Sequence, residues 1–136
     1  MIRKICFYSF LLSVLSYAFP VFADTMSNVY SSDHLSISVS KIDPEFTIQL
    51  KSNPTTGYSW FLRQYNADLV DPIGHYFQVP HTKMIGAPGI EVFRFRMKPA
   101  AFVVPQHTAL SFVYARPWVS TENTTTLVFR VSTRGD

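Results

Sequence analysis

Apolar and polar residues alternate along much of this chain, with the two-residue period that is typical of β-strands. The segments with this strand-like pattern are residues 35–39, 46–50, 58–62, 90–97, 110–115 and 127–131. In the segment 90–97, Glu91, Arg94 and Arg96 take positions between apolar residues. One face of each such strand suits a core and the other suits water, which favours antiparallel sheets with one buried face.

The remaining patterns agree with a fold made of strands. Residues 66–89 are interrupted by several proline and glycine residues, which predicts short strands and loops there, including residues 76–79. No segment repeats apolar residues at the spacing i, i+3, i+4, i+7 that a long amphipathic helix needs. We therefore predict an all-β sandwich built of two antiparallel sheets.

The first 23 residues have the features of a secretory signal peptide. Arg3 and Lys4 form a basic start, residues 5–15 are almost entirely apolar, and Ala23 provides a small residue for cleavage. The alternative is a retained membrane anchor, but serines and Pro20 interrupt an apolar run shorter than the roughly 20 residues of a spanning helix. We expect cleavage, no stable membrane anchor, and export to a periplasm, a vesicular lumen or the medium.

Removal of residues 1–23 changes the chemistry available to the mature chain. Cys6 is the single cysteine, so residues 24–136 contain no disulfide and no thiol nucleophile. Without Arg3 and Lys4, ten basic and nine acidic residues remain and the net charge falls from +3 to +1. No block of basic residues suggests a nucleic-acid partner. The 113 remaining residues suffice for one domain with one core, which we expect to be a monomer.

The sequence gives little support to catalysis, a metal or a cofactor. The four histidines are scattered without a metal-ligand spacing, and no cysteine of the mature chain joins them. No serine lies in a Gly-x-Ser-x-Gly motif, although a catalytic triad assembled in space is not excluded by sequence. Asp68 and Asp71 lie close together before Pro72 in a predicted loop and are expected to be solvated.

Three loops of unusual composition stand next to predicted strands. Their residues are Asn53, Pro54, Thr55, Thr56, Gly57 and Tyr58 in the first, Gly86, Ala87, Pro88 and Gly89 in the second, and Arg116, Pro117 and Trp118 in the third. Alternating strand directions can bring such loops to one end of a sandwich. Each loop, taken alone, is also consistent with an ordinary turn or strand end. Together they indicate a binding edge without a catalytic group.

These three motifs, in this order, resemble those of the chagasin family of cysteine protease inhibitors, over about residues 35–131. The resemblance implies an immunoglobulin-like β-sandwich and no enzymatic activity. It also implies a papain-like cysteine protease as partner, with the three loops reversibly and non-covalently blocking its active-site cleft. The first loop is then expected over the catalytic cysteine, and the other two on either side of the cleft.

The second loop departs from the family pattern, and an alternative function is compatible with the fold. Family members commonly carry a run of glycines in the second loop, whereas Pro88 stands here and restricts the backbone. Immunoglobulin-like sandwiches also serve as extracytoplasmic adhesion or ligand-binding modules, which is the alternative function. Asn123 lies in an Asn-Thr-Thr glycosylation sequon, which matters only in a eukaryotic secretory route.

Overall fold

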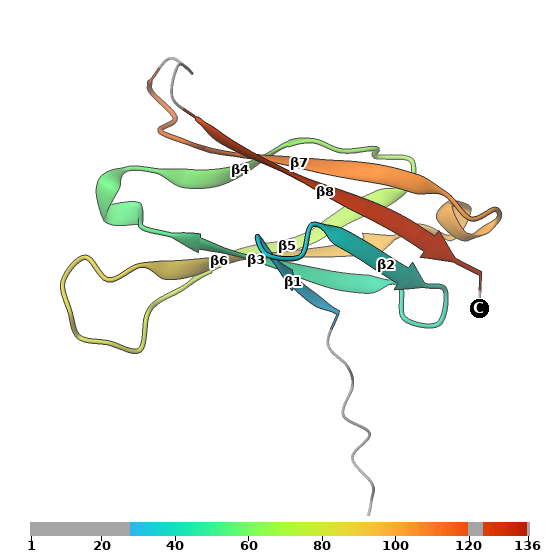
Figure 1. The fold of residues 1–136 in the computed structure, drawn as a ribbon, viewed down its shortest axis with the longest axis horizontal. Helices are drawn as coiled ribbons and strands as arrows, with labels where there is room; N and C mark the ends of the chain where they lie inside the picture. Colours follow the sequence, from blue (N-terminus) through green and yellow to red (C-terminus); the bar gives the residue numbers. More distant parts are fainter. Residues whose placement is uncertain (1–27, 120–123, 136) are drawn as a thin grey trace, which may run out of the picture.

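The structure, a computed structural model, describes residues 28–119 and 124–135, which form a sandwich of two four-stranded sheets (Figure 1). The elements in chain order are β1 (Val29–Ser31), β2 (Ser36–Ser40), β3 (Glu45–Ser52), the 3-10 helix η1 (Pro54–Thr56), β4 (Ser59–Gln64), β5 (Val70–Gln78), β6 (Gly89–Met97), the 3-10 helix η2 (Pro99–Phe102), β7 (His107–Ala115) and β8 (Thr125–Arg134).

The prediction of an all-β sandwich is confirmed, but its sheets are mixed and not purely antiparallel. One sheet has the order β1-β3-β6-β5 and the other has the order β2-β8-β7-β4. The central pairs are antiparallel, whereas β1 pairs with β3 and β2 pairs with β8 in parallel. Both parallel strands are short and lie at a sheet edge. They arise from the start of the chain, where β1 was not predicted.

Aromatic side chains from both sheets fill the core between them. Phe112 of β7 is fully buried and packs edge-to-face against Phe93, Phe95 and Phe129, with ring centroids 4.9, 6.1 and 5.7 Å away. Phe46 of β3 stacks on Phe95 at 5.4 Å. These residues take the apolar positions of the alternating pattern, and their rings add pair energies to the burial of apolar area.

Strand β5 is longer and more exposed than its sequence predicts. It runs for nine residues along β6, and only Val70 among them is buried. Pro72 and Gly74 indicate turns by themselves, yet the ladder absorbs them through an irregularity in register between these two residues. Such positions are tolerated on an edge strand, because the outer side of its backbone needs no partner in the sheet.

Two predictions concern residues outside this description. The signal peptide, residues 1–23 with Cys6, and the sequon residue Asn123 both lie outside the described residues. Within residues 28–119 and 124–135, no helix has the length and the apolar character of a membrane span.

Candidate functional site

The three loops of the predicted binding edge lie at the same end of the sandwich. They connect β3 to β4, β5 to β6 and β7 to β8, at the left of Figure 1. The ladders fix this arrangement, because Ser52 at the end of β3 pairs with Gly89, and Ser59 at the start of β4 pairs with Ala115. We call residues 53–58, 79–88 and 116–119 the loop edge.

The first loop is a single turn of 3-10 helix whose ends are set by two residues. Pro54 opens the turn after Asn53, which has the extended φ of −125° that a residue before proline favours. Gly57 ends it with a φ of +79°, and its N–H donates to the carbonyl oxygen of Pro54 at 2.9 Å. This left-handed conformation suits glycine, which has no Cβ.

The threonine hydroxyls of this loop are used within the loop itself. The Oγ1 of Thr55 donates to Oδ1 of Asn53 at 2.6 Å, and the Oγ1 of Thr56 donates to the carbonyl oxygen of Asn53, also at 2.6 Å. Both threonines are exposed. A partner therefore meets a small, neutral surface whose hydroxyl protons are already bonded.

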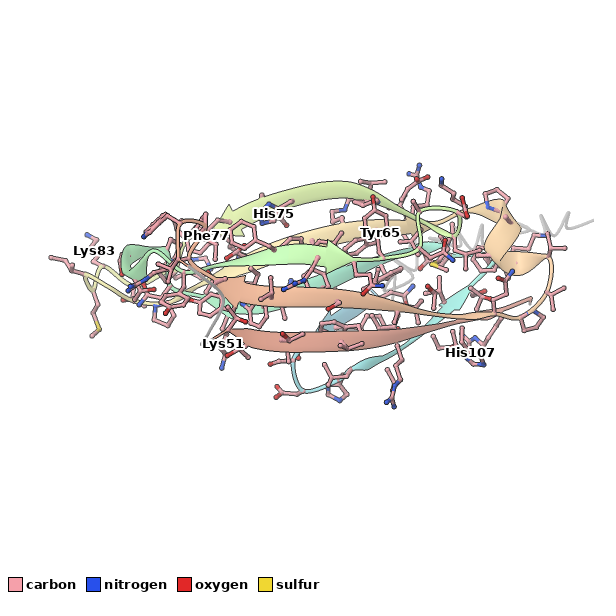
Figure 2. All side chains as sticks on the ribbon, turned by 90° about the horizontal axis from the view of Figure 1, so that it is seen from above. Lys51, Tyr65, His75, Phe77, Lys83 and His107 are labelled. Atoms are coloured by element: carbon pink, nitrogen blue, oxygen red, sulfur yellow. The ribbon has the colours of Figure 1, made fainter. Side chains whose placement is uncertain are left out.

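The second loop projects from the same end, and Figure 2 shows Lys83 at its extremity. Ala87 N–H donates to the carbonyl oxygen of Met84 at 3.2 Å, and Gly86 has a φ of +80°. A positive φ at the third residue is the mark of a type II turn. Nδ2 of Asn53 donates to the carbonyl oxygen of Gly86 at 3.1 Å, which ties this turn to the first loop.

Gly89 does not take the position that the sequence predicts for it. It is the first residue of β6 and is buried, so it offers no surface to a partner. A Cβ at this position would lie 2.2 Å from Cζ of Phe77, which covers it. Gly86, Ala87 and Pro88 remain in the loop, and Gly89 instead allows β5 and β6 to pack closely.

The third loop is braced against the first by Arg116. Its Nε donates to the carbonyl oxygen of Thr56 at 3.0 Å, and its guanidinium lies over the ring of Tyr58, 4.6 Å from the centroid. Val119 N–H donates to the carbonyl oxygen of Arg116 at 3.2 Å and closes a turn around Pro117. The three predicted motifs thus form one connected edge.

Trp118 is the largest exposed side chain of the loop edge, with 73% of its surface accessible. It is close to the first loop, since a Cβ on Gly57 would lie 3.0 Å from its Cζ2 atom. Glycine at position 57 therefore permits the positive φ and also leaves room for the indole of Trp118. Exposed tryptophan and arginine are the residue types most enriched at binding hot spots.

Three residues at or beside the loop edge were missed by the sequence analysis. Tyr114, at the end of β7, accepts a hydrogen bond from Asn53 N–H at 3.1 Å and stacks on Tyr58 with centroids 5.3 Å apart. Met84 and Ile85 are exposed at 76% and 103% at the tip of the second loop. Met84 and Ile85 could have been found from the sequence, because they are a pair of apolar residues directly before Gly86 in a segment rich in turn-forming residues.

The loop edge carries no group arranged for catalysis. Of the residues at this edge, only His81, Lys83 and Arg116 carry an ionisable side chain other than Tyr58. Across the described part of the chain, no group of three or more His, Cys, Asp or Glu side chains is placed to hold a metal ion. The edge can bind by shape, by apolar contact and by hydrogen bonds.

Comparison with known proteins identifies the family to which the chain belongs. Residues 40–132 match the model of the family described as "Chagasin family peptidase inhibitor I42". The curated protein Chagasin from Trypanosoma cruzi is 37% identical over 76 residues, which are 52% of this chain and 64% of Chagasin. The match therefore spans less than two thirds of that relative's length.

Solved structures share the fold. The crystal structure of the cysteine protease inhibitor EhICP2 from Entamoeba histolytica has a TM-score of 0.65 at 22% identity, covering 79% of this chain and 95% of that one. PbICP-C, solved in complex with falcipain-2, has a TM-score of 0.52 at 19% identity, covering 79% of this chain and 91% of its own. At these identities the likeness concerns the immunoglobulin-like fold.

Proposed function

Because this chain belongs to the chagasin family, which comprises peptidase inhibitors and not enzymes, we propose that it inhibits papain-like cysteine proteases reversibly and non-covalently. The loop edge enters the active-site cleft, with Thr55 and Thr56 over the catalytic cysteine. The observation that supports this best is the bonding between the loops, from Asn53 to Gly86 and from Arg116 to Thr56. Such bracing lowers the conformational entropy that the loops lose on binding.

The first loop is a poor substrate because three of its carbonyl oxygens are already occupied by intramolecular donors. The carbonyl oxygen of Asn53 accepts from Thr56, that of Pro54 accepts from Gly57, and that of Thr56 accepts from Arg116. A peptide bond is cleaved when its oxygen moves into the enzyme's oxyanion hole. Since these oxygens are held by intramolecular donors within a tight turn, attack by the thiolate is disfavoured and the block is steric.

Apolar side chains on either side of the first loop supply the contact area. Trp118 lies on one side, and Met84 and Ile85 lie at the tip of the second loop. A standard interface buries roughly 800 Å² of each partner, and a few aromatic anchors carry much of its energy. The surface therefore provides a rigid neutral centre flanked by apolar anchors, which suits a deep cleft.

Export of the inhibitor is a separate part of the proposal. Residues 1–23 are cleaved as a signal peptide, and the domain from residue 24 acts as a monomer in a periplasm, a vesicular lumen or the medium. The basic start and apolar run of the first 15 residues support this. Mass spectrometry of the mature N-terminus after expression in an exporting cell tests it, and an intact Met1 would contradict it.

Titration of the domain from residue 24 against papain tests the inhibitory function. We expect reversible inhibition with no cleaved inhibitor after prolonged incubation. Thr56→Arg places a long charged side chain at the centre of the edge and is expected to raise the inhibition constant on the order of a hundredfold.

Thr56→Val is the matched control, because it keeps the volume of the side chain and removes only its hydroxyl. We expect it to change the inhibition constant by no more than about tenfold, the effect of one lost hydrogen bond. Absence of inhibition by the folded wild-type domain, across several papain-like enzymes, would overturn the proposal and leave the alternative of an extracytoplasmic ligand-binding module.

A further inference from the structure

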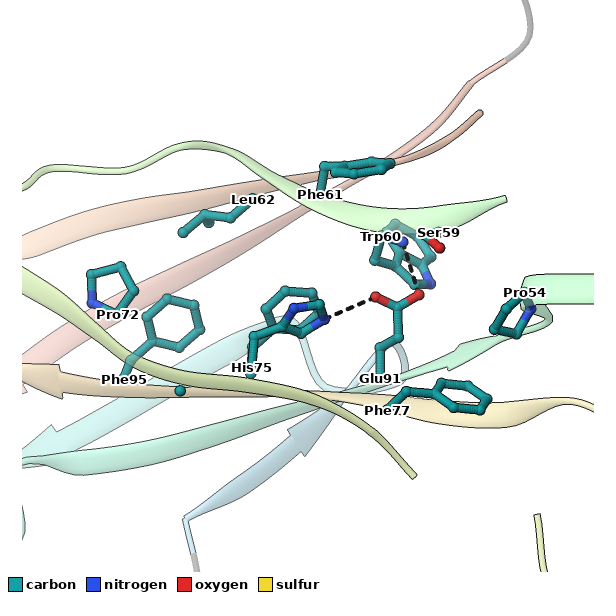
Figure 3. Close-up of a pocket in the computed structure, with 12 residues that line it drawn as sticks. Pro54, Ser59, Trp60, Phe61, Leu62, Pro72, His75, Phe77, Glu91 and Phe95 are labelled. Carbon is teal, nitrogen blue, oxygen red and sulfur yellow. Dashed lines mark hydrogen bonds and ion pairs between the residues drawn. The ribbon is translucent and has the colours of Figure 1, made fainter. Parts of the chain in front are cut away.

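The sandwich is open along one side, between the edge strands β4 and β5. A cavity of about 820 Å³ lies there, with β6 as its floor (Figure 3). Most of its wall is apolar, from the side chains of Pro54, Trp60, Phe61, Leu62, Pro72, Phe77, Phe93 and Phe95. This volume and composition fall in the range of sites for small molecules, which are concave and largely apolar with a few polar groups.

The polar centre of this cavity is the carboxylate of Glu91, whose side chain is 4% exposed. Its Oε1 accepts from Ser52 Oγ at 2.5 Å and from Trp60 N–H at 3.0 Å, and its Oε2 lies 3.1 Å from Nε2 of His75. Two carboxylate oxygens offer about four acceptor positions. Among the described residues, His75 is the one partner of Oε2, so this atom can accept a further hydrogen bond.

An added β-strand is a poor occupant of this opening. The Trp60 N–H, which could pair with a strand next to β4, is bonded to Glu91. On the opposite side, Pro72 has no N–H and lies beside the irregularity in β5. Inward-pointing charges, prolines and irregular pairing are the features by which proteins protect sheet edges from pairing. The cavity therefore favours a compact ligand over an extended peptide.

The charge of the cavity indicates the chemistry of that ligand. Glu91 and His75 are the titratable groups in its wall, so a buried anion faces aromatic surfaces and one imidazole. His75 stacks on Phe93 with ring centroids 4.2 Å apart, which holds the imidazole against the wall. A buried carboxylate is stabilised by a cationic donor, and aromatic faces also attract cations.

We propose that this cavity binds a small organic cation with a flat apolar body, whose nitrogen donates a hydrogen bond to Oε2 of Glu91. The rings of Phe77 and Phe93 contact the body of the ligand, and Leu62 covers it from β4. The carboxylate and the imidazole of the site lie on β6 and β5 and not on the loop edge, but Pro54 of the first loop also lines the cavity, so ligand binding is measured without a protease.

Calorimetric titration with 2-naphthamidine, without any protease, tests the proposal, and 2-naphthamide is the neutral probe of similar shape. We expect saturable one-to-one binding of the cation, at least about tenfold tighter than that of the amide, from one charge-assisted hydrogen bond. Absence of saturable binding of the cation, or equal affinity for both probes, would overturn it.

Two variants locate the site. Glu91→Gln keeps the shape of the side chain and is expected to abolish the preference for the cation, whereas Glu45→Gln, which removes an exposed carboxylate elsewhere on the sandwich, leaves it unchanged. Because Glu91→Gln can also impair folding, Leu62→Trp provides a second test with the carboxylate intact. Filling the cavity in this way is expected to weaken both probes about tenfold or more. Unchanged binding in folded Leu62→Trp protein would show that the ligand lies elsewhere.

Discussion

The two 3-10 helices of this protein have similar local structure and opposite roles. Each begins with a proline, at Pro54 in η1 and at Pro99 in η2, and neither has a side-chain cap at its start. Helix η1 contains no buried residue, whereas η2 buries Ala101 and Phe102. They lie at opposite ends of the sandwich (Figure 1). The same short turn therefore presents a surface at one end and closes the core at the other.

The two 3-10 helices also differ in the partners to which they are hydrogen-bonded. Thr133 of β8 is buried, and its Oγ1 donates to the carbonyl oxygen of Ala101 at 2.7 Å and accepts from Gln106 N–H at 3.0 Å. Helix η2 is thus fixed to a strand of the sheet. Helix η1 is fixed mainly to other loops, through Asn53 and Arg116. Changes at one end should affect stability, and changes at the other should affect binding.

Phe102→Ala should have the largest effect and should act on stability alone. The ring is 9% exposed, and truncation of a buried phenylalanine costs about 3 kcal/mol in cavity and transfer energy. Denaturant unfolding measures this loss, and the inhibition constant for papain should stay unchanged where the variant is folded. Val103→Ala, at the neighbouring position with 80% exposure, is the control and should change stability by less than about 0.5 kcal/mol. Equal losses of stability in both variants would contradict the role of buried Phe102 in closing the core, and a raised inhibition constant of folded Phe102→Ala protein would contradict the distinction between the ends.

Strand periodicity accounts for the parts of the fold that the sequence predicts well. The segment 46–50 alternates cleanly because one face of β3 is buried in the aromatic core. The segment 90–97 alternates only from Phe93 onward, and Glu91 is buried, so the expectation of one wet face is wrong for the first half of β6. Strand β5 was predicted only in part, since Pro72 and Gly74 indicate turns and its pairing with β6 depends on a partner distant in sequence. The short strand β1 was missed because three residues are too few to show an alternation of apolar and polar positions.

The candidate site was predictable where the backbone needs a particular residue. Pro54 and Gly57 have the conformations that their chemistry favours, so the first loop was found from local sequence. Gly89 was misplaced because a glycine required for close packing under Phe77 has the same local signal as a loop glycine. Tyr114 was missed because its hydrogen bond to Asn53 joins residues 61 positions apart.

Trp118→Ala should have the next largest effect and should act on binding alone. The indole is 73% exposed in the free protein, so its loss should change unfolding by less than about 0.5 kcal/mol. If it is buried against the protease, truncation should raise the inhibition constant about tenfold or more. Val128→Ala, on the exposed face of β8 at 44% exposure, should change neither quantity. A folded Trp118→Ala variant with unchanged inhibition would remove this residue from the contact surface.

Glu45→Gln should have the smallest effect on the free energy of unfolding. The dependence of this effect on pH distinguishes the loss of an ionised carboxylate from other causes. Glu45 is the first residue of β3 and accepts hydrogen bonds from Arg96 and, at 3.1 Å, from Arg94. The hydrogen bond from Arg96 is the main cause that lowers the pKa of Glu45 below its ordinary value of 4.5. A lowered pKa in the folded state means that the ionised group stabilises the protein above its unfolded-state pKa. This contribution is lost as the pH falls through the folded-state pKa.

The difference in unfolding free energy between wild type and Glu45→Gln should therefore be present at about pH 7 and should shrink once the pH falls below 4.5. Because the arginine and glutamate side chains are partly exposed, about 1 M salt should also reduce it. Denaturant unfolding at several pH values measures both trends. Inhibition of papain should stay unchanged, since Glu45 lies at the end of the sandwich opposite the loop edge. A difference that grows on acidification would show that Glu45 is not stabilised by its arginines in the folded protein.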